Sequence, residues 1–112
     1  MTAEELIQII KTMLGDEFAD SDNLLSVYIA QAQRECLNWE YTLIGVPELE
    51  DGEEQDYSKY DSVVIDAVIF GLSIRGAEGE TQHSENGILR GYKYSDMRQY
   101  IHTHITPFVR AV

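Results

Sequence analysis

Three histidines and one cysteine are the residues best suited to metal binding or nucleophilic chemistry. His102 and His104 are two residues apart, so on a helix they point to different faces and do not readily bind one ion. On a strand they could share a face, but Cys, Asp and Glu do not cluster around them. We therefore predict structural or surface roles for these two and for His83. Cys36 is expected to be a small core residue on a helix.

Other catalytic patterns are also missing from the sequence. Serines and acids occur, but no nucleophile elbow or similar spacing marks them. Gly71, Gly76 and Gly79 match neither a phosphate-binding loop nor a dinucleotide fingerprint. We predict no catalytic residue, no cofactor site and no metal site, and therefore a protein that is not an enzyme.

Charge is distributed unevenly along the chain. Residues 1–61 hold 15 Asp and Glu but 3 Lys and Arg, whereas residues 62–112 hold 5 of each, so the formal charge of −12 lies in the first half. Such a chain is repelled by free nucleic acid, because DNA binding is driven by neutralising phosphates. A solvated acidic surface that aids solubility is the plain interpretation. A wall past which DNA slides is the sharper one.

Helical periodicity predicts two helices in the first half of the chain. Thr2 and Glu5 form a capping box for a helix over residues 3–14, and Gly15 is expected to end it. Apolar residues at three- and four-residue steps predict a second helix over residues 21–40. From about residue 42 to 59 the periodicity stops, and an acidic loop is expected. It resembles a calcium loop in charge alone, without the alternating ligands and closing Glu.

Two further helices are predicted in the second half, over residues 60–75 and 96–105, the first ended by Gly76. Between them, residues 80–84 and 88–94 could form a β-hairpin joined at Asn86-Gly87. A lone hairpin is marginal in water, so it needs the helices or a neighbouring subunit. We therefore expect a mostly α fold, a small bundle of about four helices with one hairpin between the third and fourth. The core is predicted from the second and third helices: Leu25, Ile29, Ala32, Ile65, Val68, Ile69 and Leu72.

At 112 residues the chain fits one domain spanning residues 1–112. No apolar run approaches the roughly 20 residues that a membrane span requires. The acidic N-terminal sequence does not match a secretory signal, and a single cysteine excludes an intrachain disulfide. A reducing cytoplasm is therefore the expected compartment.

The segment 66–94, DAVIFGLSIRGAEGETQHSENGILRGYKY, is the most informative stretch. It combines an apolar helix, the junction Arg75-Gly76-Ala77-Glu78-Gly79, and a Gly-containing hairpin with aromatics, and a short helix follows it. This arrangement resembles the small head–tail connector proteins of long-tailed bacteriophages, also called adaptor or head-completion proteins. The resemblance is specific over residues 63–95. The long acidic loop and the interruption expected at Gly71-Leu72-Ser73 depart from the family pattern.

The resemblance implies a structural role in virion assembly. About a dozen copies would form a ring that docks on the portal protein after DNA packaging and extends the DNA channel towards the tail. A tail-side head-completion or stopper protein would be a further partner, and genomic DNA would pass without specific binding. The expected location is the head–tail junction of the virion, assembled in the host cytoplasm, with no membrane partner.

Two groups of residues are candidates for these contacts. The hairpin and the apolar C-terminal tail do not readily find packing partners within one monomer, so they are candidates for subunit or portal contacts. These candidates are Arg75, Glu78, Ile88, Tyr92, Tyr94, Phe108 and Val109. The candidates for channel lining are the acids of the loop, which could instead lie outside and aid solubility: Glu48, Glu50, Asp51, Glu53, Glu54 and Asp56.

Two other interpretations involve nucleic acid. The acidic first half also suits an inhibitor that mimics DNA and occupies a nucleic-acid-binding protein. Such a mimic is expected to be a monomer or small dimer, whereas a connector forms rings. The run Arg90-Gly91-Tyr92-Lys93-Tyr94 could stack on nucleic acid. A strand with an alternating face explains that run equally well.

Overall fold

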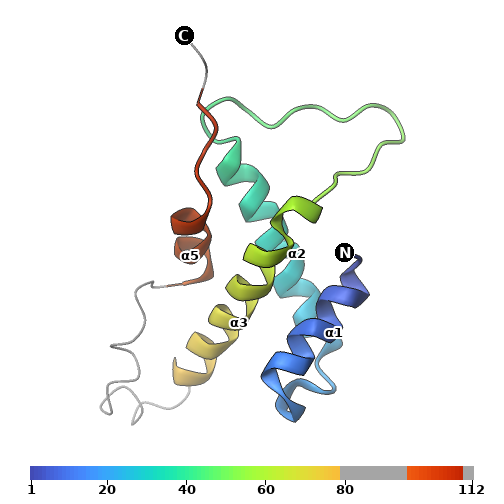
Figure 1. The fold of residues 1–112 in the computed structure, drawn as a ribbon, viewed down its shortest axis with the longest axis vertical. Coiled ribbons are helices and arrows are strands. Elements are labelled where there is room, and N and C mark those ends of the chain that lie inside the picture. The colour runs from blue at the N-terminus through green and yellow to red at the C-terminus, as the bar shows by residue number, and fades with distance from the viewer. Residues whose placement is uncertain (79–95, 110–112) are drawn as a thin grey trace.

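A computed structural model describes residues 1–78 and 96–109 of the chain (Figure 1). Within these ranges the regular structure is helical, without strands, so the prediction of a mostly α fold with four helices is confirmed. The predicted hairpin, with Ile88, Tyr92 and Tyr94, lies outside the described residues. The elements are α1 (Ala3–Leu14), η1 (Asp16–Phe18), α2 (Asp22–Glu40), η2 (Ser58–Tyr60), α3 (Asp61–Glu78) and α5 (Met97–His104).

Side-chain caps fix the starts of two helices. The capping box predicted for α1 is confirmed: the Glu5 amide donates to the Thr2 hydroxyl at 3.2 Å and the Thr2 amide to the Glu5 carboxylate at 3.0 Å. The Asp96 carboxylate accepts from the Gln99 amide at 2.8 Å and so begins α5. Gly15 ends α1 with a φ of 83°, a conformation that favours glycine.

The helices form a bundle in which α2 and α3 cross at the centre. Contacts join α3 to α1, α2 and α5, and α2 also packs on both α1 and α5. Figure 1 shows α1 on one side of the α2–α3 pair and α5 on the other. Every helix therefore buries one face against the central pair.

The core draws on each of the four α-helices in the described ranges. Leu25, Ile29 and Ala32 of α2 lie buried against Val68 and Leu72 of α3. The remaining buried residues are Leu6, Ile7, Ile10, Cys36, Leu37, Tyr60, Val64, Ala67, Ile101 and Ile105.

Ile65 and Ile69 are only partly buried, which corrects their assignment to the core centre. Residues 63–70 of α3 are apolar apart from one Asp, so periodicity could not select the inward face. In the bundle the inward stripe runs through Val64, Val68 and Leu72, so Val68 and Leu72 are buried as predicted, whereas Val64 rather than Ile65 faces inward.

Two glycines of α3 behave differently from expectation. The helix continues through Gly76 to Glu78, because a single glycine weakens a helix without necessarily ending it. Gly71 does not interrupt α3 either. It lies where three helices meet, and an added Cβ would be 3.4 Å from both Met97 of α5 and Tyr28 of α2. The small residue allows α5 to approach α3 closely.

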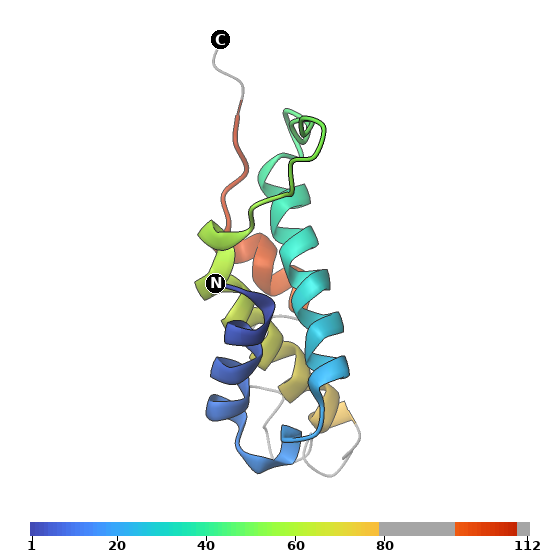
Figure 2. The ribbon, with the colours of Figure 1, turned by 90° about the vertical axis from the view of Figure 1, so that its right-hand side faces the viewer.

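The segment between α2 and η2 is an exposed loop, as its composition predicted. Its only glycines, Gly45 and Gly52, both have positive φ angles, 86° and 79°. Figures 1 and 2 show the loop leaving the bundle at the end where the C-terminal tail also leaves. Across the described residues, no helix is long and apolar enough to cross a bilayer.

Leu25 of α2 and Ile69 of α3 differ in burial, so alanine substitutions at these two positions should differ in their effect on stability. Leu25 is fully buried, so Leu25→Ala should lower the free energy of unfolding by about 2–5 kcal/mol. Ile69→Ala, at a partly buried site, should cost clearly less. Chemical denaturation of both variants measures this, and equal losses would contradict the inward stripe described here.

Gly71 provides a second test of the packing. A methyl group at 3.4 Å makes ordinary contact, so Gly71→Ala should raise the stability by up to about 1 kcal/mol through its helix propensity. Gly71→Leu should instead destabilise by about 1–3 kcal/mol, because it forces α5 away from α3. Thermal unfolding of the pair decides the matter: a destabilising Ala would mean that the helices lie closer than the structure places them.

Candidate functional site

The strongest candidate for a functional surface is the end of the bundle where the loop of residues 42–57 and the tail of residues 106–109 emerge (Figure 2). We call these two segments the docking end. Large apolar side chains rarely remain exposed together in a monomer unless they contact something. Six exposed apolar residues lie on the docking end: Leu43 (63%), Ile44 (36%), Val46 (42%), Leu49 (46%), Phe108 (42%) and Val109 (75%).

Glu40, the last residue of α2, ties the two segments to the bundle. Its carboxylate Oε1 lies 2.6 Å from Lys59 Nζ and accepts a hydrogen bond of 2.7 Å from the Tyr60 hydroxyl. Its backbone carbonyl accepts a 2.8 Å hydrogen bond from the Phe108 amide. Glu40 thus holds both the tail and η2, the short helix that joins the loop to α3.

Lys59 is surrounded by aromatic rings as well as by a carboxylate. Its ammonium lies 5.3 Å from the ring centre of Tyr41, 5.1 Å from that of Tyr60 and 5.3 Å from that of Phe108. The Tyr41 and Phe108 rings also contact each other, with centres 5.1 Å apart. Cation–π attraction and ring packing therefore hold Phe108 within its own chain.

Glu40 and Lys59 each stabilise the charged form of the other. Partial burial raises the pKa of Glu40, but the contacts with Lys59 and Tyr60 outweigh it and leave the pKa below its ordinary value of 4.5. The hydrogen bond to Glu40 raises the pKa of Lys59 above 10.5, against the opposing effect of desolvation. Both groups are therefore charged across the neutral range. Burial, followed by the hydrogen bond to Glu40, raises the pKa of the Tyr60 hydroxyl, which stays protonated.

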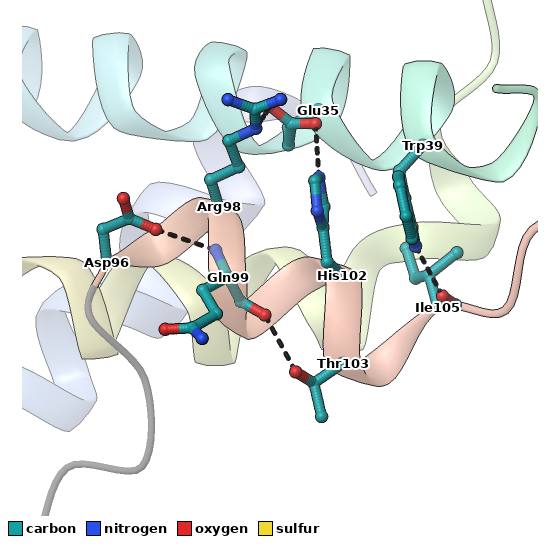
Figure 3. A network of polar contacts seen from close by, with 8 residues as sticks. All are labelled: Glu35, Trp39, Asp96, Arg98, Gln99, His102, Thr103 and Ile105. Atoms are coloured by element: carbon teal, nitrogen blue, oxygen red, sulfur yellow. Dashed lines mark hydrogen bonds and ion pairs between the residues drawn. The ribbon is translucent and has the colours of Figure 1, made fainter.

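A second polar network fixes the helix from which the tail departs (Figure 3). Trp39 of α2 donates from Nε1 to the Ile105 carbonyl at 2.8 Å, and its ring stacks on His102 with centres 3.9 Å apart. His102 Nε2 lies 2.9 Å from Glu35 Oε2, and Arg98 Nε lies 3.4 Å from Glu35 Oε1. α5 and the first residue after it are thus bound to α2.

The residues considered for chemistry do not converge. His102 faces Glu35, whereas His104 contacts the carbonyl of Tyr100 within its own helix at 2.8 Å. Burial raises the pKa of the Cys36 thiol to about 12, with Glu35 and Glu40 adding to the effect, so the thiol stays protonated. In the described ranges, no three His, Cys, Asp or Glu residues gather into a possible metal site.

The predicted contact residues are placed in different surroundings. Phe108 packs on its own chain as described above, whereas Val109 next to it is 75% exposed. Arg75 and Glu78 belong to the last turns of α3. His83, Arg90 and Lys93 lie outside the described residues, together with the hairpin positions named earlier.

The six loop acids predicted as channel candidates are all exposed. Glu50 and Glu53 hold each other locally: the Glu50 amide donates to the Glu53 carboxylate at 3.0 Å, and the Glu53 amide donates to the Glu50 carbonyl at 2.9 Å. The Asp56 carboxylate likewise accepts from the Ser58 amide, two residues away, at 2.9 Å. The loop therefore presents its carboxylates to solvent.

Sequence reasoning missed Glu40 and Lys59 as the residues that organise this end. Lys59 is the only basic residue between positions 35 and 74, directly after a run of acids, and that isolation was a usable signal. The arrangement suits protein docking: exposed apolar groups on two segments, held together at their base by a charge pair and three rings.

Comparison of the chain with family models, with curated proteins and with solved structures gives no match. The interpretation of this surface therefore depends on its own geometry and charge.

The Glu40–Lys59 pair predicts a pH-dependent attachment of the tail. Glu40 has a lowered pKa, so its contribution is present above 4.5 and is lost as the pH falls through the lowered value. Lys59 has a raised pKa, so its contribution is present below 10.5 and is lost as the pH rises through the raised value. The NMR resonance of the Phe108 amide should therefore stay unchanged between these two pH limits and should shift as the pH falls below the lower one.

Lys59→Met is the matched control, because it keeps the length of the aliphatic chain and removes the charge. The pair is partly exposed, so the variant should lose about 1 kcal/mol of stability or less. The acid shift of the Phe108 resonance should become smaller in the variant. An identical titration in both proteins would show that the pair does not hold the tail.

Proposed function

We propose that this chain is a structural subunit of a bacteriophage head–tail connector ring, which docks on the portal after DNA packaging and extends the DNA channel towards the tail. The observation that carries the proposal is the docking end, whose two segments carry exposed apolar side chains such as Leu43 and Val109 together with the six exposed acids of the loop. Apolar groups exposed together favour a protein partner. Acids beside them disfavour binding to the DNA that passes.

The proposal assigns contacts to the two ends of the bundle. The docking end, with Val109, would meet the portal or a neighbouring subunit, and a tail-side stopper protein would meet another face of the ring. A β-hairpin over residues 80–94, presenting Ile88, Tyr92 and Tyr94 next to Arg75 and Glu78, belongs to the same proposal. Its sequence signal is Asn86-Gly87, and a neighbouring subunit would supply the partner that a lone hairpin needs.

The charge of the chain supports passage of DNA rather than binding. With a net charge of −12, the subunit offers few cations to release the counterions condensed on phosphate. The exposed loop acids are candidates for the channel wall. Repulsion requires only that the wall lack basic patches, so a loop on the outside of the ring is compatible with the same function.

An acidic inhibitor that mimics DNA is the second candidate, supported by the same charge. A mimic places carboxylates at fixed positions that reproduce the phosphate spacing. Six of the acids here lie on an exposed loop that carries short-range hydrogen bonds, such as that between Glu50 and Glu53. This observation favours the connector.

The subunit should form a ring and should not bind DNA. Light scattering across a range of concentrations, with the isolated portal added in a second series, should give a closed species of many subunits. Fluorescence anisotropy with duplex DNA at physiological salt should show no measurable binding. A protein that stays monomeric in both series and binds a basic nucleic-acid-binding protein would support the mimic instead. Tight, salt-sensitive DNA binding would contradict both functions.

A further inference from the structure

A groove lies between α2 and α5, on the face of α2 that carries the network of Figure 3. Its volume is about 320 Å³. Four of its residues come from α2 and two from the start of α5: Gln31, Arg34, Glu35, Asn38, Met97 and Arg98.

The groove contains cationic groups that the bundle leaves available. Among the Lys and Arg side chains that the structure describes, Lys11, Lys59 and Arg98 each have a carboxylate partner, whereas exposed Arg34 has none. The Arg98 side chain is 71% exposed and approaches Glu35 through Nε. A guanidinium has five N–H donors, so most of those on Arg98 remain open to a ligand.

Two guanidinium groups with the amides of Gln31 and Asn38 nearby suit carboxylates as ligands. Nucleic-acid phosphate is disfavoured, because the whole subunit carries −12. The chain itself supplies the complementary group: six acids within residues 48–56 of the loop. Figure 1 shows this loop running away from α5, so the loop that reaches the groove belongs to another copy.

We propose that the acidic loop of one copy binds in the Arg34–Arg98 groove of the next. The two surfaces differ, so the contact is head-to-tail, and a head-to-tail contact whose rotation closes produces a ring. The inference thus deepens the proposed connector function and rests on it. Long-range repulsion between the acidic copies is screened beyond about 8 Å at physiological ionic strength, whereas the loop and groove charges meet within that distance.

Cysteine cross-linking tests the contact directly. Gln31→Cys in one protein and Glu53→Cys in another place thiols in the groove and on the loop, and native Cys36 is fully buried and does not interfere. Mixed under mild oxidation, the two should form a heterodimer several-fold faster than Ser26→Cys mixed with Glu53→Cys. Ser26 is an exposed α2 residue that does not line the groove. Equal rates would overturn the inference.

Reversal of charges in the groove and on the loop provides a second test of the contact. Arg34→Glu, added to the Gln31→Cys protein, should slow the cross-link several-fold, and Glu50→Lys with Glu54→Lys on the loop protein should restore it. Ser26→Glu with Ala30→Glu changes the net charge by the same two units at exposed positions outside the groove. This control should have little effect, and a loss as large as that of Arg34→Glu would overturn the inference.

The two proposals fail in different ways. A ring detected by light scattering without the selective cross-link would overturn the loop–groove contact and leave the connector function standing. A selective cross-link between copies that never form a ring would support the contact and overturn the ring. Both experiments use all 112 residues of the chain.

Discussion

The attachment of an eight-residue helix to α2 is the constraint on which the surface of this protein depends. α5 is too short to persist alone and buries Ile101 within its length. Its position is fixed by packing on α3 and by polar contacts from α2, in which Trp39 donates to the Ile105 carbonyl and Glu35 contacts His102 and Arg98. Since these contacts set where α5 lies, they also set the groove on one side and the direction of the tail on the other.

Glu40 extends the same principle to the docking end. A loop of this length closes at a modest entropic cost, but its ends must still be held together. The contacts of Glu40 with Lys59 and with the Phe108 amide hold the loop end and the tail at one point. The exposed apolar residues are therefore held at a fixed position on the bundle. The residues that hold them, Glu40 and Lys59, already contact each other within the chain.

Local signals predicted the helices well because they concern neighbouring residues. The Thr2–Glu5 box and the spacing of Leu25, Ile29 and Ala32 gave α1 and the inward face of α2. On α3 the predicted residues Val68 and Leu72 are buried but Ile65 and Ile69 are only partly so, because apolar residues surround this helix and only packing against its neighbours selects a side.

The docking end was less accessible to sequence reasoning. The tail was expected to be apolar and unsatisfied, yet Phe108 is held by Tyr41 and Lys59, residues 67 and 49 positions earlier in the chain. Gly71 was similarly expected to interrupt α3, but it lies beside Met97 of α5, where a small residue is needed for close packing. Contacts over such separations leave no periodic signal, and residue type alone cannot indicate them.

The distribution of the few cations connects the fold with assembly. Lys11 and Lys59 are each paired close to a boundary between elements, and Arg98 is paired at the first turn of α5. Each therefore offsets repulsion within an acidic chain at a point where two segments must meet. Arg34 has no such partner in the described part of the chain, because the carboxylates nearest to it in sequence, Glu35 and Glu40, are paired with other groups. A cation left free in so acidic a protein is available to the surplus carboxylates of another copy, and charge placement then gives specificity to the association rather than bulk affinity.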